Sequence, residues 1–353
     1  MSVMHKITLK GKANTNNVEG EKMKSHKNFR TDLAIETHEG LTGESGGDIP
    51  GVEMTVEEDE ALGITVTWVE IVNDTGSATM GRPVGNYITL ECGAMKENDP
   101  CTHEEIAKIM ARKLGLLHQL PKDAVILVIG LGNRQVTPDA LGPKVCEKIL
   151  VTRNMSEVMP SDIQGKLRAV CAIAPGVMGI TGMETAEIVK GITDMVKPDL
   201  IIAIDALAAR HTGRINSTIQ ISDVGINPGG GMGNKRAGIN KDSMGVPVIA
   251  VGVPTVVDAA TLVNDTMDKM LGEMAEATPE GEPFFAMLEN MQTTDRYGLI
   301  TEILAPYSGN MFVTPKEVDA VIGRLSKIIA DMLNIALHPG ITTDDVNRYI
   351  EPL

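Results

Sequence analysis

Four short, continuous apolar runs separated by longer segments constrain the fold of this chain more than any other feature. A strand that is apolar along its whole length is buried on both faces, as in a parallel sheet covered by helices on both sides. Helical patterns lie between the runs, at Asp139–Leu150 and Met183–Val196. This alternation predicts βαβ units and an α/β fold with a mostly parallel, twisted central sheet. The runs are Ala124–Ile129, Ala169–Ala174, Leu200–Ile204 and Val246–Val253.

The chain before these runs has a different pattern. Ile64–Val72 and Tyr87–Glu91 are rich in β-branched residues and predict strands, while His103–Leu117 and Lys316–Leu337 have helical spacing. We therefore expect residues 33–353 to form a single α/β domain, with a β-rich N-terminal part at 33–100 and a doubly wound part at 101–353.

Charge and length narrow the classes of partner. The 353 residues carry a formal net charge of −15, which argues against nucleic acid or an anionic membrane as the main partner. No apolar run approaches the ~20 residues that a membrane span requires. The four cysteines form no CxxC pair, so we expect neither a zinc site nor a redox motif. These features predict a soluble protein of a reducing cytoplasm.

Residues 1–32 are polar and rich in lysine, with neither strand nor helix periodicity, and predict a mobile tail. The first segment that looks able to fold follows directly, and it begins with Thr31–Glu36, "TDLAIE".

Two aspartates occupy positions that suit chemistry, because functional groups of an open parallel sheet gather at the carboxyl ends of its strands. Asp205 directly ends the run "LIIAID", and Asp139 follows "VILVIGLGNRQVTP". Either one alone has a structural explanation, as a helix cap or as a strand-end carboxylate bonded to a loop. Together they can share a proton and activate a water, or they can hold a divalent metal, and the sequence does not separate these alternatives.

Two glycine-rich loops lie near the aspartates in the predicted sheet order. "GLGN", with Gly132 and Asn133, does not complete the GxGxxG dinucleotide fingerprint, so we expect no nucleotide cofactor and, in all, no cofactor. "NPGGGMGNKR" carries Lys235 and Arg236 and predicts either anion binding or a flexible substrate or subunit contact. A single Asp-Thr-Gly-Ser at Asp74–Ser77 spells an aspartic-protease signature, but we interpret it as a turn between two strands.

Long motifs in the chain resemble the germination (spore) protease family of spore-forming bacteria. The resemblance implies a zymogen that removes its own propeptide and then degrades small acid-soluble spore proteins during germination. It also implies a homotetramer, the cytoplasm of the spore core, and a fold like that of hydrogenase-maturation endopeptidases. The motifs are "FRTDLAIE", "VIGLGNRQVTPDALGPKV", "APGVMGITGMET", "PDLIIAIDALAAR", "TIQISDVGINPGGGMGNKR", "VPVIAVGVPTVVDA" and "NMFVTPKEVD".

The resemblance also implies roles for individual residues. Family substrates are cut after the first Glu of a sequence like Thr-Glu-Ile/Phe-Ala-Ser-Glu, and "TDLAIE" is similar at each position, which implies self-cleavage between Asp32 and Leu33. Residues 1–32 would then be the propeptide. Asp139 and Asp205 match the two aspartates proposed as the catalytic pair. Strand-end amides or the "GLGN" loop would stabilise the oxyanion.

Three basic side chains, Arg210, Lys235 and Arg236, are candidates to bind the substrate glutamates, although surface or subunit salt bridges explain them equally well. Two other functional classes stay open. One is a metal-dependent peptidase that uses the same carboxylates, with His211 or Asp258 nearby. The other is a protein without catalytic activity that binds peptides or a metal.

Overall fold

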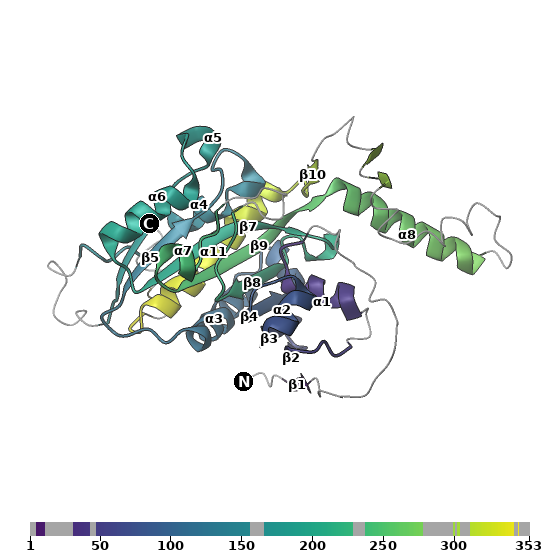
Figure 1. The fold of residues 1–353 in the computed structure, drawn as a ribbon, viewed down its shortest axis with the longest axis horizontal. Helices are drawn as coiled ribbons and strands as arrows, with labels where there is room; N and C mark the ends of the chain where they lie inside the picture. The colour runs from purple at the N-terminus through teal and green to yellow at the C-terminus, as the bar shows by residue number, and fades with distance from the viewer. Residues whose placement is uncertain are drawn as a thin grey trace.

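The computed structural model describes residues 5–10, 31–42, 47–155, 166–228, 237–277, 299–300, 302–303, 311–341 and 345. Its elements follow each other along the chain as shown in Figure 1. The strands are β1 (His5–Lys10), β2 (Val52–Asp59), β3 (Ile64–Ile71), β4 (Gly85–Glu91), β5 (Val125–Gly130), β6 (Ala169–Ile173), β7 (Leu200–Ala209), β8 (Thr218–Ser222), β9 (Val248–Asp258) and β10 (Phe312–Val313). The α-helices are α1 (Ala34–Thr42), α2 (Asp74–Met80), α3 (Pro100–Leu117), α4 (Leu141–Cys146), α5 (Met178–Thr181), α6 (Thr185–Val196), α7 (Lys241–Met244), α8 (Ala259–Ala277) and α11 (Val318–Leu337). The 3₁₀ helices are η1 (Gly93–Lys96), η2 (Thr137–Asp139) and η3 (Thr212–Arg214).

One sheet runs through the whole described molecule, in the order β1-β2-β3-β4-β8-β9-β7-β5-β6, with β10 also paired to β9. The α/β class and the flanking helices are confirmed. A mostly parallel sheet is not: β9, β7, β5 and β6 pair in parallel, whereas the other pairings are antiparallel. Strand β8, which the sequence pattern does not single out, pairs with both β4 and β9 and so joins the two halves.

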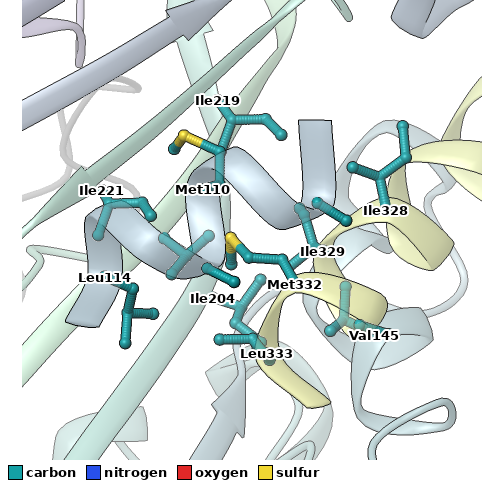
Figure 2. Close-up of a cluster of buried hydrophobic side chains, with 14 of the residues drawn as sticks. Met110, Leu114, Val145, Ile204, Ile219, Ile221, Ile328, Ile329, Met332 and Leu333 are labelled. Atoms are coloured by element: carbon teal, nitrogen blue, oxygen red, sulfur yellow. The ribbon is translucent and has the colours of Figure 1, made fainter. Parts of the chain in front are cut away.

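Helices cover both faces of the parallel part. On one face α3, α4 and α11 pack over the sheet, and Figure 2 shows Met110, Val145 and Met332 from these helices meeting Ile204 of β7. On the other face Val189 of α6 packs with Leu127 of β5 in a second cluster. Alternate residues of a strand point to opposite faces, so a central strand covered on both sides must be apolar throughout.

Most predicted elements appear with nearly the predicted bounds. Helix α3 begins at Pro100, where Asp99 caps it by accepting the N–H of Thr102 at 3.2 Å. The predicted helix Asp139–Leu150 is instead η2 followed by the shorter α4. The Asp-Thr-Gly-Ser segment is not a simple turn but opens helix α2, capped by Asn73.

Two further differences concern bounds. Strand β7 continues to Ala209, so Asp205 lies inside the strand rather than at its end. Residues 5–10, within the segment predicted as a mobile tail, form β1 and pair with β2, which would otherwise be the edge strand of the sheet. An edge strand presents unpaired N–H and C=O groups, which any passing segment can satisfy. Among the helices of the described residues, no candidate membrane span occurs.

Candidate active site

Asp205 lies on β7 where the neighbouring strand β5 has just ended. The last β5 pair is Gly130 with Ile204, and the N–H of Leu131 still donates to the Ile204 carbonyl at 2.8 Å. Asp205 itself is only 6% exposed, and its Oδ1 accepts the N–H of Ala206 at 2.9 Å. Beyond this carboxylate, β5 no longer pairs with the edge of β7 that faces it, and we call this edge the open side of β7.

Asp139 closes the loop that follows β5. Its Oδ2 accepts the N–H of Asn133 at 2.8 Å. Gly132 has φ 107°, and a Cβ there would lie 2.0 Å from the Asp139 carbonyl oxygen, so only glycine fits. Both "GLGN" residues named from the sequence thus hold Asp139 in place. Their predicted role toward an oxyanion stays a prediction.

Contacts to the rest of the fold fix the position of η2. The hydroxyl of Thr255 in β9 donates to the Pro138 carbonyl at 2.7 Å, and that of Thr137 donates to Asp319 of α11 at 2.7 Å. Gly142, in the first turn of α4, comes so close to β5 and β7 that a Cβ would lie 2.6 Å from the Ile204 carbonyl. These contacts fix η2, which carries Asp139, and α4 against β7, which carries Asp205, and against its neighbours β5 and β9.

The segment Thr31–Glu36 lies against the open side of β7. The N–H of Asp32 donates to the Ala208 carbonyl at 3.0 Å, and Asp32 Oδ2 accepts the N–H of Ala208 at 2.9 Å. Alternate residues of a strand direct their backbone groups to the same side. The backbone groups of three residues therefore follow one another along the same edge of β7. Ile204 contacts Leu131, Ala206 contacts the Asp205 carboxylate, and Ala208 contacts Asp32.

The carbonyl of the predicted cleavage bond is held by two side chains. Asp32 O accepts from Arg82 Nη1 at 3.0 Å and from Gln220 Nε2 at 3.1 Å. Gln220 Oε1 also accepts the N–H of Ala34 at 2.7 Å, and Arg82 Nη2 donates to the Thr31 carbonyl at 3.1 Å. Burial lowers the pKa of Arg82 from its ordinary value, and the Asp32 carboxylate opposes that shift.

Glu36 is the most enclosed acid of this segment, at 2% exposure. Its carboxylate accepts the backbone N–H of Arg210 at 2.7 Å and of His211 at 2.9 Å, and the hydroxyl of Thr31 also donates to it. Arg214 Nη1 lies 3.7 Å away. A buried carboxylate is tolerated only when hydrogen bonds replace those it makes with water, and here the two residues that follow β7 supply two of them.

Arg214 also binds two other carboxylates. It reaches both oxygens of Glu39 at 2.6 and 2.7 Å and donates from Nε to Glu91 at 2.6 Å. Burial alone lowers the pKa of Arg214, but the hydrogen bonds to Glu39 and Glu91 outweigh it and raise that pKa above its ordinary value. The guanidinium thus fastens α1 to β4 and stands behind Glu36.

The residues around Thr31–Glu36 form what we name the cradle. Its members are Arg82, Ala208, Arg210, His211, Arg214 and Gln220. Of these cradle residues, only Arg210 was expected from the sequence to bind substrate, through its side chain, whereas in the structure its backbone N–H contacts Glu36. Lys235 and Arg236 lie outside the described residues. Arg82 and Arg214 lie in none of the quoted motifs, and Gln220 lies in one of them without being marked there as a binding residue. Only the tertiary fold brings these three residues to the segment.

Neither residue suggested for a metal-dependent site adds to a ligand cluster. His211 contributes its backbone N–H to Glu36, and Asp258 caps the start of α8 by accepting the N–H and hydroxyl of Thr261 at 3.3 Å. Among the residues that the structure describes, no group of three or more His, Cys, Asp and Glu side chains gathers in a way that could hold a metal ion.

Comparison with known proteins adds an independent finding. The family model described as "Germination protease" matches residues 31–284 and 276–350, so the match begins at Thr31. A germination protease of Caldanaerobacter subterraneus subsp. tengcongensis is 49% identical over 322 residues, covering 91% of this chain and 98% of the relative. One of Clostridium tetani is 47% identical over 321 residues, covering 91% and 99%, and one of Bacillus cereus is 41% identical over 360 residues, covering 92% and 98%.

Proposed function

The chain belongs to the germination protease family, and from this premise we propose that it is a self-processing endopeptidase that cuts its own chain between Asp32 and Leu33. Membership makes it a peptidase of spore germination rather than a protein that only binds peptides. In this proposal residues 1–32 are the propeptide that is removed, and residues 33–353 are the mature domain that remains.

One observation carries this proposal: Asp32 and the Asp205 carboxylate occupy neighbouring positions along the open side of β7. The separation of two residues along a strand is about 7 Å. The bond to be cut therefore lies two residues along β7 from the position that the Asp205 carboxylate occupies. The uncut chain must shift along β7 by that distance before it reacts. Such a position suits a zymogen that is stored and later activated.

The proposed chemistry is water activation by the aspartate pair. Two carboxylates that are close together do not both ionise readily, so one keeps a proton while the other accepts one. The ionised carboxylate takes a proton from water, the hydroxide adds to the carbonyl of residue 32, and the protonated carboxylate donates to the departing nitrogen of Leu33. Asp139 and Asp205 fill these two roles.

The remaining expectations of the sequence belong to the same proposal. Small acid-soluble spore proteins are the substrates in trans, the working form is a homotetramer, and the site of action is the spore core. A fold related to that of hydrogenase-maturation endopeptidases is part of the proposal, supported by the motifs around Asp139, in η2 after β5, and Asp205, on β7.

The test is the intact mass of purified protein after incubation at mildly acidic pH, with and without a chelator. We expect the wild type to lose residues 1–32 and Asp139→Asn and Asp205→Asn to stay whole. Asp123→Asn, which changes an exposed aspartate, is the matched control and should be processed like the wild type.

Three outcomes would revise the proposal. Processing of both aspartate variants would remove the pair from the mechanism. A cut at another bond would reject the Asp32–Leu33 assignment. Processing that a chelator stops and added metal restores would turn the same carboxylates into metal ligands.

A further inference from the structure

Strand β9 has a β-bulge just beyond the level at which it pairs with Asp205 of β7. Between residues 207 and 208 of β7 the pairing skips one residue of β9, Thr255. Before the bulge, Val253 packs in the cluster beneath α3, α4 and α11, whereas after it Val257 packs with Leu207 on the opposite face. Strict alternation would place residues 253 and 257 on one face. Bulges of this kind re-aim a side chain and are common beside active sites.

The re-aimed side chain reaches the turn that carries Asp139. Thr255 is only 1% exposed, and its hydroxyl donates at 2.7 Å to the carbonyl of Pro138, the residue directly before Asp139. Its own carbonyl accepts the hydroxyl of Thr314 at 2.9 Å. Thr314 follows β10, which pairs with β9 beyond the bulge. The bulged residue is therefore fastened to β10 on one side and to η2 on the other.

Helix α11 supplies a second support for η2. The hydroxyl of Thr137 donates to Asp319 Oδ1 at 2.7 Å, and Asp319 lies in the first turn of α11. The contacts close a ring that runs from η2 to the bulge, to β10, to the start of α11 and back to η2. The motif "NMFVTPKEVD", which the proposed function does not use, supplies half of this ring. We name it the η2 clamp, with the members Thr137, Thr255, Thr314 and Asp319.

The turn itself has little to hold it in place. Its backbone hydrogen bonds run from the N–H of Asp139 to Val136 O at 2.8 Å and from the N–H of Ala140 to Thr137 O at 3.1 Å. A 3₁₀ helix of this length has poorer hydrogen-bond geometry than an α-helix. Displacing a catalytic group by about 1 Å can slow a reaction on the order of a hundredfold. A carboxylate on such a turn therefore needs outside support to stay in its working position.

We propose that the η2 clamp is the positioning device of this protease, in which Thr255 and Asp319 are positioning residues that hold Asp139 in its working place beside Asp205. They act on Asp139 through η2 and not on the substrate. The effect on rate rests on the proposed function. The effect on η2 does not, and it can be measured without catalysis.

Amide hydrogen exchange tests the effect on η2. All chains carry Asp205→Asn to prevent cutting, and intact mass verifies that they are whole. The compared chains are this background alone and the background with Thr255→Val, with Thr255→Ser or with Thr193→Val. Thr193 is a matched control, because it is 3% exposed and its hydroxyl donates to a backbone carbonyl in α6 at 2.8 Å.

Valine keeps the shape of threonine but removes the hydrogen-bond donor. Thr255→Val should speed exchange of the N–H groups of Asn133, Asp139 and Ala140 about fivefold, the effect of one lost hydrogen bond. Thr255→Ser keeps the hydroxyl and should exchange like the background at these amides. Thr193→Val should also leave them unchanged, since it removes a buried hydroxyl from another part of the fold.

The rate of processing tests the effect on catalysis, in chains that keep Asp205. Thr255→Val should slow the loss of residues 1–32, followed by intact mass, by about ten- to a hundredfold. Thr255→Ser and Thr193→Val should process like the wild type, and urea unfolding verifies that every chain is folded. Thr137→Val removes the support from α11 and should also slow processing. The double variant should be slowed less than the product of the two single effects, because both displace the same turn.

Unchanged exchange at the three amides in Thr255→Val would overturn the inference, and so would processing of Thr255→Val at the rate of Thr193→Val. Should Thr255→Val fail to fold, Thr137→Val, whose side chain is only partly buried, takes its place in both measurements. A wild type that stays whole while Thr255→Val loosens η2 rejects the proposed function and leaves the clamp on Asp139 standing. Equal processing of the wild type and Thr255→Val rejects the clamp and leaves the proposed function standing.

Discussion

The buried imidazole of His338 should make this protein lose stability as the pH falls from 7 to 5. His338 is 0% exposed and follows helix α11. Its Nδ1 accepts the N–H of Arg168 at 3.3 Å, and its Nε2 lies 3.3 Å from the Leu150 carbonyl. The pKa of His338 is lowered from 6.5 to about 4, chiefly by burial; the hydrogen bond to the Leu150 carbonyl opposes the shift and the charge of Arg168 adds to it.

The sign follows from proton uptake. Between pH 6.5 and pH 4 the unfolded chain binds a proton on this imidazole while the folded chain does not, so acid favours the unfolded state. The stability contributed by the neutral imidazole is present above the unfolded pKa and is lost as the pH falls below it. Integration with these two pKa values gives a loss of about 2 kcal/mol from pH 7 to pH 5.

Urea unfolding at pH 7 and pH 5, at one protein concentration, measures this loss. We compare the wild type with His338→Gln and with His118→Gln, whose histidine is only half-buried. His338→Gln should depend on pH by about 2 kcal/mol less than the wild type, whatever its absolute stability. His118→Gln should keep most of the wild-type dependence. The reasoning is refuted if the wild type and His338→Gln lose equal free energy over this interval.

Two further substitutions test the scaffold of the site. Gly132→Ala places a methyl group 2.0 Å from the Asp139 carbonyl at φ 107°, so we expect processing to slow at least tenfold, read by intact mass over time, and unchanged processing would disprove the tight fit. Arg214→Lys keeps the charge but loses the forked contact with Glu39. It should lower the free energy of unfolding by about 2 kcal/mol in urea, and a loss below about 0.5 kcal/mol would show that the fork adds little.

The sequence pattern predicted the parallel part of the fold because each of its strands is marked by an apolar run of consecutive residues. A run such as Leu200–Ile204 can be satisfied only in the middle of a covered sheet, and β7 begins at its first residue. Strands β3 and β4 and helix α3 were predicted for the same reason, whereas β1, inside the predicted tail, was not. The sequence could not say how the two halves join, because β8 is a five-residue strand and its partner β4 lies more than a hundred residues before it in the chain.

The candidate site likewise has a part that the sequence predicted and a part that it could not predict. Asp139 and Asp205 are placed by motifs next to predicted strand ends, and both lie on the elements around the end of β5, although their catalytic role stays a proposal. Of the substrate-binding residues predicted from positive charge, Arg210 contacts Glu36 through its backbone N–H, and Lys235 and Arg236 lie outside the described residues. No sequence pattern marks the two backbone donors to Glu36, from Arg210 and His211, because every residue except proline carries a backbone N–H.

The sequence by itself determined the α/β class, the positions of the two aspartates and the segment Thr31–Glu36, because each depends on residues that are neighbours along the chain. Only the tertiary structure decided that this segment lies on the open side of β7, beside Asp205 and between Arg82 and Gln220. The physical reason is that β5 ends at Gly130 while β7 continues to Ala209. The backbone groups of β7 beyond that point need partners, and the start of the folded chain supplies them.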